Sequence, residues 1–271
     1  RKTLARELEW INMSPKGRHA KGKARINAYE AMLSHESERL APDLEIYIPP
    51  GPRLGKSVIE FKNVSKSMGD KLLVDDASFI VPAGAIVGII GPNGAGKTTS
   101  FYMITGIIKP TSGEVTLDGQ DISTWPLYRR ARVGLSYLPQ ESSIFRRLTV
   151  RQNLQMILEH TDLTKAQQKA KADQLMEEFG LTRLEKSYAS YLSGGERRRL
   201  EITRAMVTNP SFLMLDEPFS GVDPKAVYEV QQIIRKLQKR NMGILITDHN
   251  VRETLSVVDR AYLMVHGEVM L

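Results

Sequence analysis

The sequence predicts an α/β domain whose sheet is mostly parallel and covered by helices. Three short apolar runs, Ala85–Ile90, Phe212–Leu215 and Gly243–Thr247, have the length and composition of strands that are buried on both faces. Helical patterns separate them, chiefly over residues 151–185 and 224–240. Strands and helices that alternate in this way form parallel sheets with helices on their faces.

The residues before this core indicate a separate arm. Residues 1–12 and 20–40 have helical patterns, and the proline-rich run Ile48–Pro52 excludes regular structure and marks a linker. We therefore expect a basic helical arm with a proline-rich linker over residues 1–56, followed by the α/β domain over residues 57–271.

Two further features complete the predicted domain. Strand patterns at Val58–Phe61, Ala77–Val81 and Val115–Leu117 predict a small antiparallel β layer. A helical subdomain is expected at about residues 141–195.

Composition limits the class of protein. Hydrophobic residues make up 41% and charged residues 25% of the chain, as in soluble globular proteins. No run approaches the roughly 18 consecutive apolar residues of a membrane span. The first residues are basic and polar rather than apolar, so they do not form a signal peptide. The absence of cysteine excludes disulfides and thiolate metal sites and fits a cytoplasmic protein.

Positive charge is concentrated at the N-terminus. Residues 1–25 hold eight Lys or Arg and two acidic residues, so this segment carries +6 of the net charge of +7. Clustered basic residues favour binding to a polyanion. A solvated helix face is the simpler explanation of the same charges.

A phosphate-binding loop follows the first buried strand. Residues 91–98 fit the pattern G-x-x-x-x-G-K-[ST] between a predicted strand and a predicted helix. The glycines let backbone N–H groups surround phosphates, and the helix N-terminus adds a favourable dipole. We expect Lys97 to reach the β and γ phosphates of ATP and the Thr98 hydroxyl to bind Mg²⁺. The residues expected to bind the nucleotide here are Gly91, Asn93, Gly94, Gly96, Lys97, Thr98 and Thr99.

Two carboxylates end the strand Phe212–Leu215. Asp216 and Glu217 stand where a buried parallel strand emerges, which is where ligands bind in open α/β sheets. We expect Asp216 to join the Mg²⁺ shell and Glu217 to orient or deprotonate the attacking water, because phosphoryl transfer depends on positioning and charge stabilisation.

A third motif identifies a family. The run Leu192–Glu196, which leads into a predicted helix over residues 197–208, resembles the signature motif of ABC ATPases. This resemblance implies the ABC type of P-loop NTPase fold. In that family the signature loop of one subunit caps the ATP bound to another, which implies contacts from Ser193, Gly194 and Gly195. A second ATPase domain, most simply a second copy of the chain, is the implied partner.

The remaining family elements follow in the expected order. Gln140 matches the Q-loop, Asp223 the D-loop that contacts nucleotide, and His249 the switch histidine. The resemblance implies that Glu217, His249 and Gln140 are catalytic. It also implies that Gln140 joins Thr98 and Asp216 around Mg²⁺. The other histidines lack such a context, and the basic run at the start of the signature helix indicates a solvated helix face.

One position departs from the family pattern. Family members usually place an aromatic residue near the first strands, where it stacks on adenine, and Met68 occupies the matching position. A thioether packs against a ring without aromatic stacking. We therefore expect Met68 to contact the base, with weaker selection for adenine.

Residues from about 97 to 271 resemble the ATPases of lipopolysaccharide exporters. The matching runs are Tyr137–Glu141, Ser143–Leu148, Leu192–Arg199 and Leu245–Thr254. The resemblance implies a cytoplasmic ATPase dimer, held at the inner membrane by membrane-spanning permease subunits. It places Phe145 and Arg146 in a groove for a partner's helix, although ordinary packing and surface charge explain both residues equally well.

Residues from about 3 to 96 instead resemble ABC-F translation factors of the energy-dependent translational throttle kind. The matching runs are Glu7–Trp10, Ser14–Arg18, Ile48–Gly55 and Ala85–Lys97. In that family the basic segment contacts tRNA and the ribosome, which makes them alternative partners for residues 1–25. Two resemblances on one chain indicate a fusion, a reconstructed sequence or a fragment.

The favoured interpretation is a transport ATPase, because nearly every residue expected to do chemistry lies in the exporter-like part. The alternative is a ribosome-associated factor that acts through its basic arm. A nucleotide-binding module without turnover is a third possibility, against which Glu217 and His249 argue.

Overall fold

The larger of two sheets has six strands in the order β10-β9-β3-β8-β7-β6. The computed structural model of the chain describes residues 58–221 and 223–270. All neighbours in this sheet are parallel except β9 and β10. The strands are β3 (Ile86–Ile90), β6 (Leu135–Leu138), β7 (Phe212–Asp216), β8 (Gly243–Thr247), β9 (Arg260–Val265) and β10 (Glu268–Met270). The predicted mostly parallel sheet is therefore confirmed.

The smaller sheet is antiparallel and has the order β2-β1-β4-β5. Its strands are β1 (Val58–Met68), β2 (Lys71–Pro82), β4 (Ser112–Leu117) and β5 (Gln120–Asp121). This sheet is the predicted antiparallel layer, and β1 and β2 extend beyond their predicted bounds. The predicted arm and linker, residues 1–56, lie outside the described residues.

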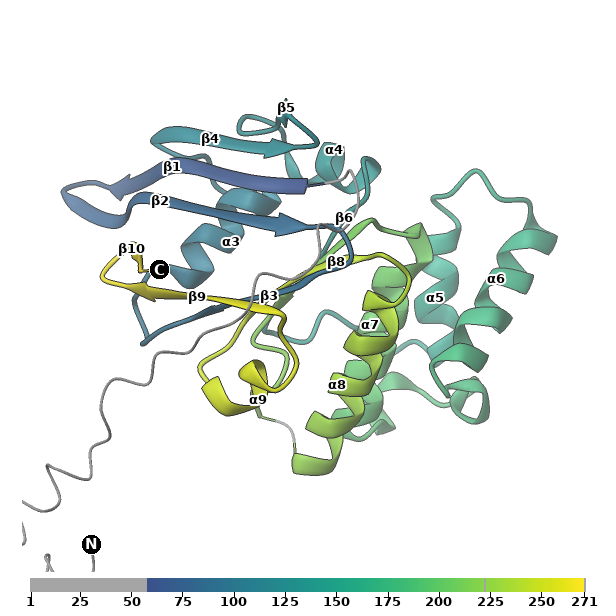
Figure 1. Cartoon of the computed structure of the whole chain (residues 1–271). Coiled ribbons are helices and arrows are strands. Elements are labelled where there is room, and N and C mark those ends of the chain that lie inside the picture. The colour runs from purple at the N-terminus through teal and green to yellow at the C-terminus, as the bar shows by residue number, and fades with distance from the viewer. Residues whose placement is uncertain (1–57, 222, 271) are drawn as a thin grey trace, which may run out of the picture. The chain divides into compact units, whose positions relative to one another are not determined.

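Helices cover the larger sheet and form a lobe beside it (Figure 1). They are α3 (Lys97–Thr105), α4 (Leu127–Arg132), α5 (Val150–Leu158), α6 (Lys165–Glu178), α7 (Gly194–Ala205), α8 (Pro224–Gln238) and α9 (Val251–Leu255). Short 3-10 turns lie at Thr182–Leu184, Ala189–Tyr191 and Met206–Thr208. Within the described part of the chain, no helix has both the length and the apolar character that a membrane crossing requires.

The predicted helical region 151–185 divides into α5, α6 and a 3-10 turn. Helix α6 starts anew because Thr164 and Gln167 form a capping box, which satisfies the first backbone N–H groups of the helix. The signature helix α7 starts three residues before its predicted position, and Ser193 and Glu196 form the same kind of cap there.

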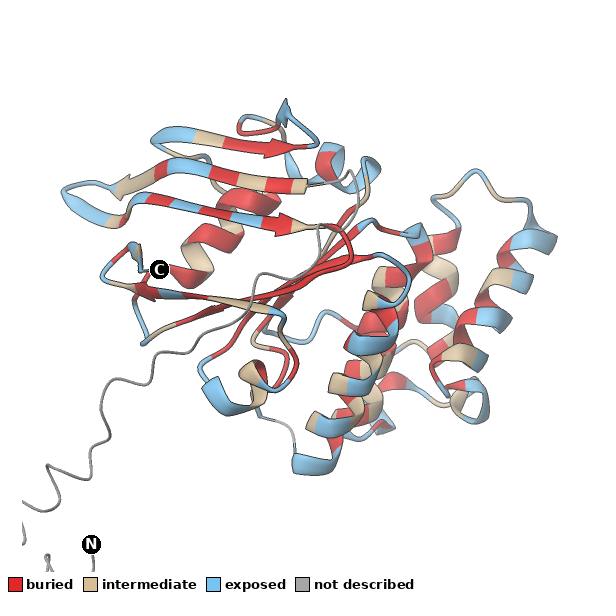
Figure 2. Ribbon diagram, viewed as in Figure 1, coloured by how far each residue is buried: buried red, intermediate tan, exposed pale blue. Residues whose placement is uncertain are grey.

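Two hydrophobic cores lie on the two faces of the larger sheet. On one face, Leu213 and Ile244 pack with Val230 and Ile234 of α8. On the other face α3 lies between the two sheets, and its Phe101 and Ile104 belong to that core. Figure 2 shows strands β3, β7 and β8 buried throughout. Because these strands are rigidly packed, the loops at their ends have fixed positions.

A buried arginine fixes the end of the phosphate-loop helix. The guanidinium of Arg130, which has no exposed surface, donates to the carbonyls of Met103 at 2.7 Å and Ile104 at 2.6 Å at the end of α3. It also donates to the carbonyls of Trp125 and Ser123. Burial lowers the pKa of Arg130 to about 10, so the side chain is charged at neutral pH and neutralises the helix C-terminus.

Candidate functional site

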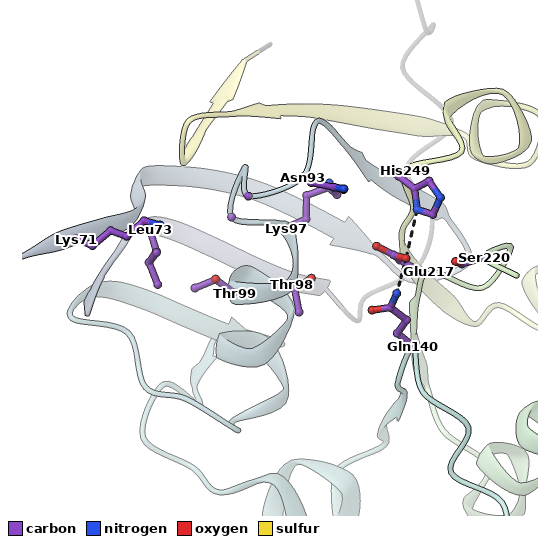
Figure 3. Close-up of a pocket in the computed structure, with 12 residues that line it drawn as sticks. Lys71, Leu73, Asn93, Lys97, Thr98, Thr99, Gln140, Glu217, Ser220 and His249 are labelled. Atoms are coloured by element: carbon purple, nitrogen blue, oxygen red, sulfur yellow. Dashed lines mark hydrogen bonds and ion pairs between the residues drawn. The ribbon is translucent and has the colours of Figure 1, made fainter. Parts of the chain in front are cut away.

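One pocket brings together most of the motif residues (Figure 3). Its volume of about 510 Å³ is in the range of small-molecule sites. It lies where β3, β7 and β8 end, as expected for an open α/β sheet. The residues that line it are Lys71, Leu73, Asn93, Gly94, Gly96, Lys97, Thr98, Thr99, Gln140, Glu217, Ser220 and His249.

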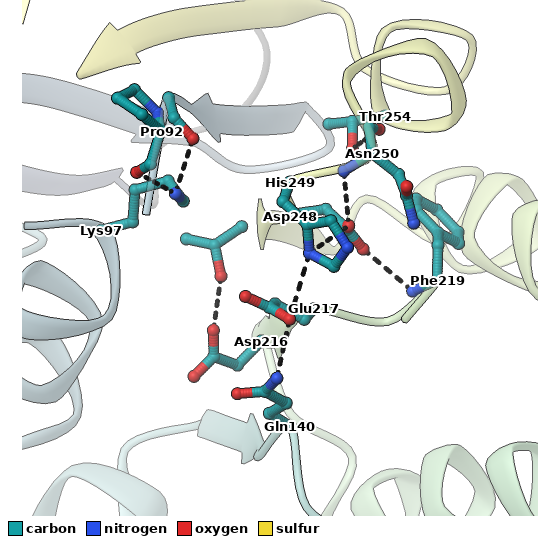
Figure 4. A network of polar contacts seen from close by, with 12 residues as sticks. Pro92, Lys97, Gln140, Asp216, Glu217, Phe219, Asp248, His249, Asn250 and Thr254 are labelled. Carbon is teal, nitrogen blue, oxygen red and sulfur yellow. Dashed lines mark hydrogen bonds and ion pairs between the residues drawn. The ribbon is translucent and has the colours of Figure 1, made fainter. Parts of the chain in front are cut away.

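The phosphate loop has a backbone that only glycine allows. At Gly91 a Cβ atom would lie 2.1 Å from the carbonyl oxygen of Met264, so a side chain there would displace β9. Gly96 has φ of 99°, in the left-handed region that glycine favours. The ammonium of Lys97 donates to the carbonyls of Gly91 at 2.7 Å and Pro92 at 2.8 Å (Figure 4). The loop therefore holds a positive charge beside its own N–H groups.

The charge of Lys97 is opposed by burial and supported by neighbours. Burial lowers the pKa of Lys97, and the nearby carboxylates of Glu217, Asp248 and Asp216 raise it in turn. These groups place one cation among several anions, so the site can accept a polyphosphate and a divalent cation together.

Asp216 ends strand β7 and is almost completely buried, at 2% exposure. Its Oδ1 accepts a hydrogen bond from the Thr247 hydroxyl at 2.6 Å, and the Tyr137 hydroxyl lies 3.4 Å from its Oδ2. Burial raises the pKa of Asp216, and the two hydroxyl contacts lower it. The carboxylate is therefore fixed in orientation and has spare acceptor capacity for a cation.

The next residue, Glu217, has an unusual backbone. Its φ of 45° lies in the left-handed region, which is rare for a residue with a side chain. Its N–H donates to the carbonyl of Thr247 at 2.7 Å, so the chain leaves β7 while it is still tied to β8. This turn directs the Glu217 side chain into the pocket instead of along the strand.

Three predicted catalytic residues meet at one carboxylate oxygen. Gln140 Nε2 donates to Glu217 Oε2 at 2.7 Å, and His249 Nδ1 lies 3.3 Å from the same oxygen (Figure 4). Asp248 supports them, because it accepts from the backbone N–H groups of Phe219 at 3.0 Å and Asn250 at 2.8 Å. The segments after β7 and β8 are thereby held together, with Gln140 facing them from the end of β6.

The donor set fits Mg²⁺ held jointly with a nucleotide. Thr98, Asp216 and Gln140 offer only oxygen ligands of the hard kind that Mg²⁺ prefers. Across residues 58–221 and 223–270, no cluster of three or more His, Asp or Glu residues could hold a metal by itself. Mg²⁺ usually binds through one or two protein groups together with phosphates, which agrees with this sparse set.

Several predicted site residues do not line this pocket. The signature residues Ser193, Gly194 and Gly195 begin α7, where the capping box orders the loop. Asp223 caps α8 and accepts from the N–H groups of Lys225 and Ala226. Neither group lies at the pocket of its own chain, which is the arrangement expected if both serve a second copy.

Met68 also lies outside the residues that line the pocket, and its expected contact with the base stays a prediction. It is 64% exposed at the end of β1, and Lys71 and Leu73 line the pocket instead. The tight turn after β1 pairs Met68 directly with Lys71 across the hairpin, so these two side chains share one face of the sheet. A two-residue turn is a sequence signal for this pairing, and it could have indicated Lys71.

Comparison with known proteins gives the family. The family model described as ABC transporter matches residues 74–220, more than half of the chain. The chain belongs to the ABC transporter family. It is therefore an ATP-binding domain of an ABC ATPase, and the predicted fold class and ATP hydrolase activity are those of this family.

Individual relatives agree with this assignment. The chain is 50% identical over 215 residues to the lipopolysaccharide export system ATP-binding protein LptB of Haemophilus influenzae, covering 79% of this chain and 89% of that protein. The ADP conformation of an ATP-binding cassette of an ABC transporter matches with a TM-score of 0.72 at 26% identity, over 79% of this chain and 89% of that one. A dimeric bacterial ABC transporter cassette matches with a TM-score of 0.70 at 25% identity, over 79% and 97%. These comparisons lend no support to the resemblance between residues 3–96 and ABC-F factors.

Proposed function

We propose that this ABC ATPase is the motor subunit of a lipopolysaccharide export system, held at the inner membrane by permease subunits. The similarity to LptB over most of the length of that protein carries the proposal. The pocket supports it, because the phosphate loop, Gln140, Glu217 and His249 converge as a hydrolytic site requires.

Each side chain then has a distinct task in hydrolysis. Lys97 exchanges its two backbone carbonyls for the β and γ phosphates of ATP. Thr98, Asp216 and Gln140 would hold Mg²⁺. The cation supplies charge neutralisation at the phosphates. Glu217 orients the attacking water or accepts a proton from it. His249 stabilises the charge that develops on the terminal phosphate.

The active form is proposed to be a dimer. Ser193 caps α7, and Gly194 and Gly195 form its first turn at the positive end of the helix dipole, which suits a phosphate. Since they do not line the pocket of their own chain, a second copy related by a two-fold axis would bring them to the nucleotide.

A groove on the surface is the proposed binding site of a permease helix. Its lining consists mostly of β6 and the ends of α4 and α7, and it adjoins Phe145 through Arg204. The Arg204 guanidinium lies 5.3 Å from the Phe145 ring centroid and donates to the carbonyl of Ser143 at 2.7 Å. Phe145 is 45% exposed, and Arg146 next to it is exposed as well. An exposed aromatic ring and a cation beside an apolar groove suit an amphipathic helix.

The local backbone presents Phe145 to solvent in a fixed position. Buried Asn153 accepts from the Phe145 N–H at 3.0 Å, and its amide donates to the Phe145 carbonyl at 3.1 Å. Because both backbone groups are held, the Phe145 backbone is ordered before a partner binds and loses little conformational freedom on binding.

Affinity capture from a cell lysate tests the proposed function. The Glu217→Gln chain loaded with ATP is expected to recover membrane permease subunits. The additional change Phe145→Ala with Arg146→Ala should reduce that recovery, whereas Tyr228→Ala, an exposed aromatic residue that lines a different pocket, should not. Recovery of ribosomes that requires residues 1–56 would instead assign the chain to translation.

Replacement of Met68 by Tyr is expected to lower the KM for ATP. Directly paired residues of an antiparallel hairpin share one face, so a ring at position 68 would stand beside Lys71 at the pocket. Aromatic stacking contributes about 0.5–1.5 kcal/mol, which corresponds to a KM lowered by roughly 2- to 12-fold. The KM for ATP is measured from steady-state phosphate release. Leu72→Tyr is the control, because Leu72 is exposed and points to the opposite face of β2 from Leu73, and an equal effect of both changes would contradict base stacking.

A further inference from the structure

Tyr137 lies between the groove and the nucleotide site. It belongs to the edge strand β6. Together with Leu127, Ala131 and Ile157, it lines the groove proposed above for the permease helix. It also packs against the core that surrounds α3. No step of the proposed hydrolysis uses this side chain, although its hydroxyl reaches the carboxylate at the end of β7.

The hydroxyl of Tyr137 contacts the one oxygen of Asp216 that is free of a short hydrogen bond. Oδ1 is held by Thr247 at 2.6 Å, and the tyrosine hydroxyl lies 3.4 Å from Oδ2. Strands β6 and β7 are parallel neighbours, with Tyr137 opposite Met214, which fixes the two residues at this spacing. The hydroxyl is the donor in this contact, because the carboxylate oxygen can only accept.

We propose that Tyr137 is a positioning residue that links the groove to the metal site: the residue lines the groove, and its hydroxyl orients Asp216 for Mg²⁺. The inference rests on the proposed function, which places a partner helix in the groove and Mg²⁺ at Asp216. An occupant of the groove that displaces the ring also displaces the hydroxyl, because the ring is rigid. Binding of a partner therefore changes the affinity of the nucleotide site for its cation.

The expected size of the effect follows from the geometry. Removing a group that orients a metal ligand commonly weakens metal binding by about 10- to 100-fold. The contact of 3.4 Å is long for an O–H···O hydrogen bond, and Thr247 still holds the other oxygen. We therefore expect a smaller loss of roughly 3- to 10-fold when the hydroxyl is removed.

The first test measures cation binding directly. Mn²⁺ replaces Mg²⁺ as an electron paramagnetic resonance probe, and its dissociation constant is determined for the full chain saturated with ADP. Tyr137→Phe keeps the ring and should raise that constant by about 3- to 10-fold. Tyr128→Phe is the matched control, because Tyr128 is 65% exposed on α4 and is absent from both pockets. An unchanged constant in Tyr137→Phe overturns the proposal.

The second test asks whether the groove acts through this hydroxyl. Ala131 lines the groove from α4, and Ala131→Trp narrows it with a bulky side chain. We expect this change to alter the Mn²⁺ constant at least about 2-fold when Tyr137 is present and to leave it unaltered in the Tyr137→Phe chain. Equal shifts in both backgrounds, or no shift in either, overturn the link.

Failure of the inference can be distinguished from failure of the proposed function. A fluorescent ATP analogue in EDTA reports nucleotide binding without a cation, and the Tyr137 variant should bind it as the unaltered chain does. If the unaltered chain does not bind the ATP analogue, the proposed function is refuted. Normal binding combined with an unchanged Mn²⁺ constant in Tyr137→Phe would refute only the role of Tyr137.

Discussion

The Glu217→Gln chain is expected to bind ATP normally and to release phosphate about 10²- to 10⁴-fold more slowly than the unaltered chain, the range that general acid–base groups contribute. The amide fills the same space, so the contacts to Gln140 and His249 can persist, but it cannot accept a proton. Steady-state phosphate release and a separate ATP-binding titration measure the two effects.

Glu268→Gln provides the control for this change, since Glu268 is exposed on β10 and outside the pocket. It should hydrolyse ATP at the unaltered rate. Light scattering of the Glu217→Gln chain with ATP should detect a dimer, because the uncleaved nucleotide holds two copies together. A strict monomer at high concentration would contradict the proposed dimer, and equal rates for the Glu217→Gln and unaltered chains would contradict the catalytic assignment.

The second large effect is expected at Lys97. Replacement by Ala should weaken binding of ATP by roughly 10²-fold, because a hydrogen bond between charged groups contributes about 1.5–3 kcal/mol. Lys97 is the only lysine of the phosphate loop, and in the structure it faces two loop carbonyls that a phosphate can replace. A fluorescent nucleotide titration measures the change.

Lys71→Ala is the matched control, because Lys71 lines the same pocket from the exposed start of β2. We expect its affinity for ATP to fall by no more than about 5-fold, as an exposed charge contributes less than about 1 kcal/mol. Comparable losses in the two variants would show that general positive charge binds the nucleotide and would contradict a specific role for Lys97.

The strands and the phosphate loop could be predicted from sequence because each depends on a local property. Short apolar runs with no polar face are typical of strands buried on both sides, and β3, β7 and β8 contain such runs. The spacing from Gly91 to Thr98 likewise fixes the loop, since the backbone needs glycine where β9 approaches.

What could not be predicted depends on contacts between distant segments. Arg130 is buried because four carbonyls from other segments surround it. Tyr137 has no local signal either, because its contact with Asp216 exists only after β6 and β7 pair. Sequence patterns locate groups along the chain, but side-chain orientation follows from the packing.

The left-handed backbone at Glu217 lowers the stability of the fold at a residue that is proposed to be catalytic. A non-glycine residue in that conformation costs about 1–2 kcal/mol, which glycine would largely avoid. Selection of variants for heat resistance alone would therefore favour Gly at position 217, and with it loss of the carboxylate that we propose to be catalytic.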